Sequence, residues 1–337
     1  MERTAYSQPR GALLYFHGNG CDVGQMQSYP PLHDLCRHLG LHLVLVEYPG
    51  YGPSPGLPNE TSVMAAATAA YHFVCTALRV PPGRIIFYAT SIGTGVAVEL
   101  AARVNAAVEQ DAGRCATAAP QQAEAEERAT RSSEKTVRPR TTRAAISSDM
   151  AAAMPAARPW GMLLEAPPMS IRRVAAGFVS AASSLMQDRF DSLHRLPQVG
   201  DVPVFFVHGD CDELIPAEHS QTLAQVAQSE QCEVVIVPGG THNDLLGPWP
   251  ARAIDFFEQA FHGGAGTMAD DPPLLSEADV WAALPPQPSE EQLEAQAERQ
   301  HAQVEASERA IMRLSSVADS FAGAVAYMAS CFTFRRE

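Results

Sequence analysis

The feature that most limits the fold of this chain is a regular alternation of short apolar segments with longer segments of helical spacing. Most of the short segments are apolar throughout and rich in β-branched residues; they are residues 12–16, 41–47, 84–89, 161–165, 202–208 and 233–237. Helical patterns lie between them, at residues 24–39, 60–79, 92–105, 217–228 and 250–261. Strands buried on both faces and separated by helices predict an α/β fold with a mostly parallel sheet flanked by helices.

Such a sheet also predicts where a functional site lies. Right-handed crossovers bring the carboxyl ends of parallel strands to one edge, and ligands bind beyond that edge. The residues that directly follow each predicted strand are therefore the candidates for chemistry.

Two stretches of different composition interrupt or follow this pattern. Residues 106–157 contain almost no large apolar side chains, so burial cannot offset the entropy of ordering them, and we predict a disordered insertion. From residue 263 the chain is Pro-rich and acidic, and residues 289–312 have the pattern of a polar helix. We therefore expect one α/β domain over residues 11–262 that contains the insertion, followed by a linker and helical tail over residues 263–337 without a role in chemistry.

Composition excludes several classes of function. The formal net charge of −14 argues against nucleic acid as the main partner, because phosphate recognition needs clustered Lys and Arg. The seven cysteines are scattered and form no C-x-x-C pair, which favours free thiols in the cytoplasm over disulfides or a zinc site. No apolar run reaches the ~18 residues of a membrane span. Residues 321–334 are apolar but short, and we expect them to pack on protein. We find no motif for a nucleotide, another cofactor or a metal ion.

The strongest chemical signal is the pentapeptide Ala-Thr-Ser-Ile-Gly at residues 89–93. It follows a predicted strand and opens a predicted helix, which is the context of a nucleophile elbow. Gly93 meets the need for a small residue after the serine, whereas Ala89 replaces the usual first glycine. Ser91 is the candidate nucleophile; alone, the motif is also compatible with a serine that caps a helix.

A serine hydroxyl needs a base, and in this type of fold an acid and then a histidine follow the serine along the chain. Asp212 follows the strand predicted at 202–208, and His242 follows the strand predicted at 233–237. His242 is the candidate general base, and Asp212 is the candidate acid that orients it. Asp210 competes with Asp212 for that role.

A fourth element follows the first strand, in the sequence Tyr-Phe-His-Gly-Asn-Gly-Cys-Asp at residues 15–22. Acyl transfer requires an oxyanion hole with one N–H from the residue after the nucleophile and one from this loop. The first donor is the N–H of Ile92. The second is the N–H of Asn19, with Gly20 as the alternative.

Together these segments resemble a known family. Residues 15–22, 47–52, 91–94, 208–216 and 241–244 are similar to α/β-hydrolase-domain proteins of the bud-emergence-related group. This group is itself similar to serine aminopeptidase-like hydrolases and includes thioesterases that remove palmitate from membrane-bound GTPases. The resemblance covers residues 11–262 apart from the insertion. It implies a Ser91–Asp212–His242 triad, with Asn19 and Ile92 at the oxyanion positions.

The chain departs from this family at three points. Ala89 stands where the group usually has glycine. The antiparallel strands that usually precede His17 are missing, so we expect a sheet shortened at its N-terminal side or a misplaced start of the reading frame. No N-terminal cysteine cluster of the kind acylated in depalmitoylating members is present, which weakens the case for depalmitoylation at membranes.

The segment between the fourth and fifth predicted strands bears on the substrate. Residues 166–200 contain many apolar side chains, and those in residues 171–186 fall near helical spacing, which is compatible with an apolar cap above Ser91 or with a helix packed on the sheet. We expect a serine hydrolase that cleaves an acyl ester or thioester carried by a small molecule, a lipid or an acylated protein, in the cytoplasm or in peripheral contact with membranes. A serine peptidase of the prolyl-oligopeptidase-like clan and a non-catalytic interaction protein on the same scaffold are the alternatives.

Overall fold

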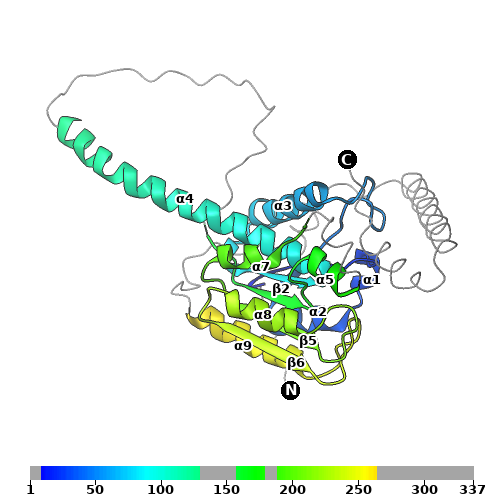
Figure 1. Cartoon of the computed structure of the whole chain (residues 1–337). Helices are drawn as coiled ribbons and strands as arrows, with labels where there is room; N and C mark the ends of the chain where they lie inside the picture. Colours follow the sequence, from blue (N-terminus) through cyan, green and yellow to red (C-terminus); the bar gives the residue numbers. More distant parts are fainter. Residues whose placement is uncertain (1–8, 130–156, 179–187, 264–337) are drawn as a thin grey trace.

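A computed structural model describes residues 9–129, 157–178 and 188–263 (Figure 1). Within these ranges six strands form one sheet, in which all neighbouring strands are parallel. The strand order is β2-β1-β3-β4-β5-β6. The bounds are Gly11–Phe16 for β1, Leu41–Val46 for β2, Ile85–Thr90 for β3, Gly161–Glu165 for β4, Val204–Gly209 for β5 and Cys232–Val237 for β6. The predicted α/β class and parallel sheet are confirmed, and each predicted strand matches an observed one to within two residues at either end.

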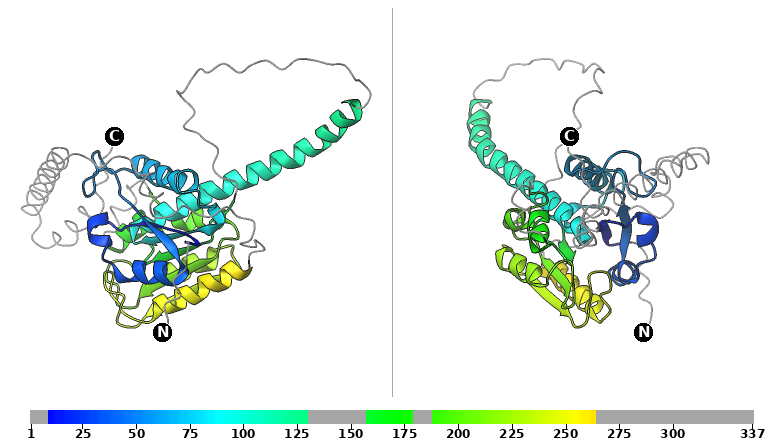
Figure 2. Two further views of the ribbon diagram at one scale, coloured as in Figure 1. Left: turned by 180° about the vertical axis from the view of Figure 1, so that it is seen from behind. Right: turned by 45° about the vertical axis from the view of Figure 1, so that its right-hand side comes forward.

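Helices cover both faces of the sheet. The described helices are α1 Val23–Met26, α2 Pro30–Leu39, α3 Glu60–Thr76, α4 Ile92–Ala129, α5 Ile171–Phe178, α7 Ser192–Arg195, α8 Glu218–Val226 and α9 Trp249–Gly263, with short 3-10 turns at Pro82–Arg84 and Leu196–Val199. Helices α2 and α9 pack side by side on one face (Figure 2). Helices α3, α4 and α8 contribute to the core on the other face.

The two cores follow from the alternation of side chains along each strand. In β1, Leu13 and Tyr15 belong to the core under α2 and α9, whereas Leu14 and Phe16 belong to the core under α3 and α4. Successive side chains of a strand point to opposite faces, so a strand covered by helices on both sides must be apolar at every position. This is why most positions of the strands are apolar.

Two predicted helices have different bounds in the structure. The helix predicted at 24–39 is divided into α1 and α2, because Pro30 occupies the first turn of α2, where a residue without an N–H is tolerated. The helix predicted at 60–79 ends at Thr76, and Arg79 has a φ of 56°, which no right-handed helix can contain.

The largest difference concerns the end of the helix predicted at 92–105. Helix α4 does not end at residue 105 but continues to Ala129, and it projects from the body of the molecule (Figure 1). Ala, Glu, Gln and Arg dominate residues 106–129 and are strong helix formers, so local propensity favours a helix here. Residues 130–156, the second half of the segment predicted at 171–186, and the tail from residue 264 onward lie outside the described residues.

The topology brings four loops together. The segments that follow β1, β3, β5 and β6 all leave the carboxyl edge of the sheet, because every strand pair is parallel. The candidate residues of the sequence therefore start from one edge, although up to 223 positions separate them along the chain, from Asn19 to His242.

Candidate active site

Ser91 is the single residue between the end of β3 and the start of α4. Its φ of 53° lies in the left-handed region, which residues other than glycine rarely adopt. Such strain persists only where surrounding structure holds it, and here the N–H of Ser91 donates to the carbonyl oxygen of Glu165 at 2.8 Å. The chain thus turns sharply at Ser91, in the strand–turn–helix context of a nucleophile elbow.

The small residues around Ser91 are explained by close backbone contacts. A methyl group on Gly93 would lie 2.3 Å from the carbonyl oxygen of Phe16 and 2.6 Å from that of His17, so only glycine fits there. Ala89, on the other side of the serine, is fully buried within β3. The strand therefore accommodates the extra methyl group at the position where related motifs have glycine.

His242 lies in the loop after β6 and connects the other two candidate residues. Its Nδ1 is 2.7 Å from Oδ2 of Asp212, and its Nε2 is 3.0 Å from Oγ of Ser91. An ionised carboxylate can only accept hydrogen bonds, so Nδ1 carries the proton and Nε2 accepts from the Ser91 hydroxyl. The histidine is 8% exposed, which leaves its hydrogen bonds largely shielded from water.

Asp212 is held as an anion by its surroundings. Its side chain is completely buried, and Oδ1 accepts the N–H groups of Leu214 at 2.9 Å and Ile215 at 2.8 Å. Burial by itself raises the pKa of Asp212. Hydrogen bonds from His208 and His242, the charge of His242 and the N–H of Ile215 outweigh burial, and the net pKa lies below the ordinary value of an aspartate.

Asp210, the competing acid, has a different position. It is exposed, and its Oδ1 accepts the N–H of Gly239 at 2.6 Å. This bond ties the loop after β5 to the loop after β6. The structure therefore puts Asp212, and not Asp210, in contact with His242.

Two buried residues near Ser91, His242 and Asp212 were not singled out from the sequence. His208, in β5, places Nε2 at 3.2 Å from Oδ2 of Asp212, and its Nδ1 lies 2.7 Å from Oγ of Ser220. Glu165 ends β4 next to Ser91. In the sequence, the only sign of these two residues is a titratable side chain near the carboxyl end of an apolar run, and this alone is a weak indication of a functional residue.

The loop after β1 packs against the nucleophile. A methyl group on Gly18 would lie 3.3 Å from Cβ of Ser91, and the hydroxyl of Tyr51 donates to Oδ1 of Asn19 at 2.5 Å. Ile92 begins α4, and the first N–H groups of a helix lack partners within the helix and carry the positive end of its dipole. The segments of both predicted oxyanion donors, Asn19 and Ile92, thus adjoin Ser91.

His17, at the start of this loop, is held by hydrogen bonds. It is fully buried, with Nδ1 at 2.9 Å from the carbonyl oxygen of Gly18 and Nε2 at 2.9 Å from Oε1 of Glu47. Its ring lies 4.2 Å from the ring of Tyr48, measured between centroids. These contacts hold the start of the loop in place beside Ser91.

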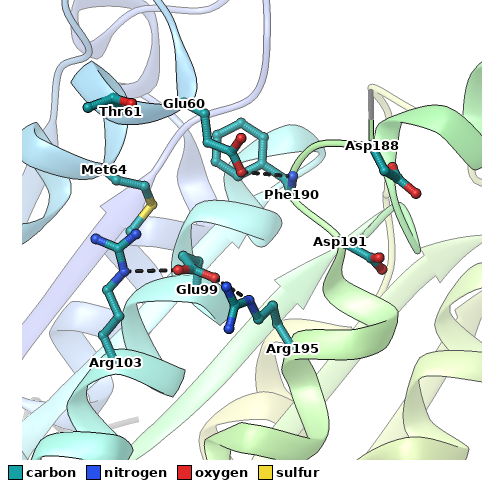
Figure 3. Close-up of a pocket in the computed structure, with 9 residues that line it drawn as sticks. All are labelled: Glu60, Thr61, Met64, Glu99, Arg103, Asp188, Phe190, Asp191 and Arg195. Atoms are coloured by element: carbon teal, nitrogen blue, oxygen red, sulfur yellow. Dashed lines mark hydrogen bonds and ion pairs between the residues drawn. The ribbon is translucent and has the colours of Figure 1, made fainter. Parts of the chain in front are cut away.

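A polar cavity of about 390 Å³ lies elsewhere, between α3, α4 and the segment that leads into α7 (Figure 3). Glu99 lies between two guanidinium groups there, 2.9 Å from Nε of Arg103 and 2.8 Å from Nε of Arg195. None of the residues proposed for catalysis lines this cavity. We therefore assign its charged side chains to the packing of α7 on α4, and base the candidate site on the contacts around Ser91.

Comparison with known proteins identifies the family of this chain. The family model described as serine aminopeptidase, S33, matches residues 7–247, which is most of the chain. The chain belongs to the serine aminopeptidase S33 family. The predicted membership of the α/β-hydrolase superfamily is thereby confirmed, and the family places the chain among the hydrolases.

Curated relatives of this S33 family member share the domain but are longer. Alpha/beta hydrolase domain-containing protein aho-3 of Caenorhabditis elegans is 30% identical over 233 residues, which cover 69% of this chain and 52% of the relative. Alpha/beta hydrolase domain-containing protein 17C of Xenopus laevis is 28% identical over 240 residues, or 70% of this chain and 57% of the relative. The chain thus spans about half the length of these relatives.

A solved structure with a similar course of the chain is the acetyl ester-xyloside bifunctional hydrolase from Caldicellulosiruptor lactoaceticus. It aligns with a TM-score of 0.49 and 17% identity, over 75% of this chain and 84% of that chain.

Neither a membrane-spanning helix nor a metal-binding cluster is found among the residues that the structure describes. Over residues 9–129, 157–178 and 188–263, no helix combines the length and the apolar character needed to cross a bilayer. In the same ranges, no three His, Cys, Asp or Glu side chains are grouped so that they could hold a metal ion.

Proposed function

We propose that this S33 family member is a serine hydrolase that transfers an acyl group from an ester or thioester to water. The observation that carries the proposal is the continuous row of hydrogen bonds from Ser91 through His242 to Asp212, with lengths of 3.0 and 2.7 Å. A surface serine that merely caps a helix would need neither partner. The left-handed φ of Ser91 gives independent support, because strained backbone clusters at functional sites.

The first half of the reaction forms an acyl-enzyme. Ser91 attacks the substrate carbonyl with Oγ while Nε2 of His242 takes the hydroxyl proton. Asp212 accepts from Nδ1 throughout, which fixes the tautomer and stabilises the positive charge that forms on the ring. The negative oxygen of the tetrahedral intermediate is held by the N–H groups of Ile92 and Asn19.

The second half regenerates the enzyme. His242 gives its proton to the leaving alcohol or thiol, which departs as the carbonyl reforms. A water molecule then takes the place of the leaving group, loses its proton to His242 and attacks the acyl carbon. Collapse of this second intermediate returns the proton to Ser91 and releases the acid.

An acyl ester or thioester is the substrate class that the contacts favour over a peptide with a free amino terminus. Recognition of an ammonium group requires a carboxylate with spare acceptors near the nucleophile. The buried carboxylates around Ser91 already have partners: Asp212 has His242 and two backbone N–H groups, and Glu165 accepts three hydroxyl groups. We therefore propose an uncharged acyl group, carried by a small molecule, a lipid or an acylated protein, as the group that Ser91 accepts.

The decisive experiment is active-site labelling of the full chain with a fluorophosphonate, followed by a substrate screen. We expect the wild type to be labelled and Ser91→Ala to be unlabelled. The screen compares short- and long-chain acyl esters, the matching thioesters and aminoacyl amides. Ester or thioester turnover that is lost in Ser91→Ala supports the proposal. Turnover of amides alone would favour the peptidase alternative, and equal turnover by Ser91→Ala would refute a serine mechanism.

A further inference from the structure

Glu165 is joined to the nucleophile through its backbone and is sealed from solvent. It ends β4 opposite Thr90 of β3, and its carbonyl oxygen accepts the N–H of Ser91 at 2.8 Å. The residue is only 4% exposed, yet it carries a carboxyl group. Charged side chains are almost never fully buried without partners, so this carboxyl needs an explanation.

The partners of this carboxyl group are three hydroxyls. Tyr88 donates to Oε2 at 2.5 Å, Tyr29 donates to Oε1 at 2.8 Å, and Thr90 donates to Oε2 at 3.3 Å. An ionised carboxylate is an acceptor only, and donors from strand β3 and from the residue before α2 are arranged around it. These donors can accommodate a negative charge on a residue that is paired with Thr90 and hydrogen-bonded through its backbone to Ser91.

We propose that Glu165 is a positioning residue of the hydrolysis, which stabilises the positive charge that forms on His242 and holds the strand end that carries Ser91. This inference rests on the proposed serine mechanism. Asp212 contacts the imidazole directly. Glu165 interacts with His242 electrostatically and supplies a second negative charge. Two anions near one histidine favour its protonated form, which is the form that appears in the transition state.

The pKa of Glu165 reflects opposing effects. Burial, the largest effect, raises the pKa of Glu165, and the hydroxyl groups and the positive charge of His242 lower it. The net pKa is higher than that of an ordinary glutamate. The titratable groups that interact with Glu165 come from several elements: Tyr15 and Tyr88 in strands, Cys21 and Tyr29 between β1 and α2, and His242 after β6.

The test is the pH profile of ester hydrolysis by the full chain carrying Glu165→Gln, which keeps the size and an acceptor oxygen but removes the charge. Without that charge the imidazolium of His242 is less stable. We expect the acid limb of kcat/KM to move to lower pH by up to about one unit, and kcat on the plateau to fall about tenfold with little change in KM. Glu165→Asp retains the charge and should restore the position of the acid limb.

Glu99→Gln is the matched control, because it removes another poorly exposed glutamate charge, in the cavity of Figure 3, which no triad residue lines. Its acid limb should coincide with that of the wild type. If Glu165→Gln does not fold by circular dichroism, Tyr29→Phe, which removes only one donor to the carboxylate, should move the acid limb in the same direction by a smaller amount.

The outcomes separate this inference from the proposed function. Wild-type hydrolysis that depends on Ser91, combined with an acid limb that does not move in Glu165→Gln, overturns the role of Glu165 alone. A lower kcat without a shift of the acid limb means a purely structural role and overturns it as well. Hydrolysis that survives Ser91→Ala refutes the mechanism on which both rest.

Discussion

Asp210 and Asp212 lie two residues apart on the loop after β5 and make different contacts. Asp212 is buried and accepts from His242 and from two backbone N–H groups. Asp210 is exposed and accepts the N–H of Gly239, in the loop after β6. A carboxylate that orients the base must touch it, so the two residues are distinguished by geometry and not by residue type.

Asp212→Asn should leave the fold intact and reduce kcat by about 10⁴, because an amide cannot hold His242 in the tautomer with a proton on Nδ1. Asp210→Asn should reduce kcat by less than about tenfold, since it alters one loop contact. Steady-state kinetics on an ester substrate compare the two variants. Greater damage from Asp210→Asn would show that the acid has been assigned to the wrong residue.

The sequence predicts the central residues of the site because their chemistry is tied to local patterns. Ser91 lies in a five-residue motif, and His242 and Asp212 each follow an apolar run in the expected order. Glu165 and His208 were missed for a physical reason. Each lies at or next to the carboxyl end of a strand. The hydroxyl partners of Glu165 come from elements far away in the sequence, and the partners of His208 come from the loop after β5 and from α8.

At the scale of elements, the junction of β3 and α4 depends on how closely two backbones approach. The start of α4 passes the end of β1 at Gly93, where a side chain would overlap the carbonyl oxygens of Phe16 and His17. Backbone atoms at the centre of a parallel sheet cannot yield as a flexible side chain can. The elbow is therefore held in place by packing as much as by hydrogen bonds.

Gly93→Ala should lower the free energy of unfolding by about 3 kcal/mol and the melting temperature by about 10 °C. Gly83→Ala is the control, because the nearest atom to its added methyl group would lie 3.8 Å away, in ordinary contact. Differential scanning calorimetry of both variants and the wild type measures the effect. Equal melting temperatures for the two variants would contradict the close approach at Gly93.

Element boundaries were harder to predict than the elements themselves. Composition identifies residues 106–157 as a stretch without large apolar side chains, but it does not decide between a solvated helix and a disordered chain. The structure continues α4 through the first part of this stretch, to Ala129. Helix propensity acts locally and needs no core, so a search for buried surface alone placed the helix end too early.

The two ends of this insertion lie next to each other. Nε of Arg158 donates to Oδ1 of Asn105 at 2.6 Å, and Arg158 also lies 3.9 Å from Glu109. Of the residues of α4 whose side chains are described, the buried ones end at Asn105. The chain can therefore pass from α4 to β4 over a short distance without the residues in between.

Replacing residues 112–156 by a linker of about six Gly and Ser residues should leave the domain folded and active. We expect a melting temperature within about 2 °C of the wild type and kcat/KM within about twofold, because no described buried contact is removed. Calorimetry and ester hydrolysis measure both. A variant that aggregates, or melts about 10 °C lower, would mean that the replaced residues contribute to the stability of the domain.

At the scale of the whole molecule, stability depends on ionisable groups that folding has buried. His219 begins the first turn of α8 and is 8% exposed. Its Nδ1 accepts the N–H of Met169 at 3.0 Å, which requires that nitrogen to be without a proton. Burial, followed by the charges of His208 and Arg173, lowers the pKa of His219 from 6.5 to about 4.

A base with a lowered pKa in the folded state binds fewer protons than in the unfolded state. Between about pH 6.5 and about pH 4, His219 is protonated in the unfolded chain and neutral in the folded one. His219 therefore makes the free energy of unfolding fall as the pH falls through this range.

The variant His219→Asn tests this effect, because it keeps an acceptor near the N–H of Met169 and removes the titration. Urea unfolding across this range should show that the wild type loses about 2 kcal/mol more than His219→Asn, after allowance for partial solvent screening. His38→Asn, at an exposed histidine of α2, should keep the wild-type slope. The same slope in all three proteins would mean that His219 does not control the acid side of the stability curve.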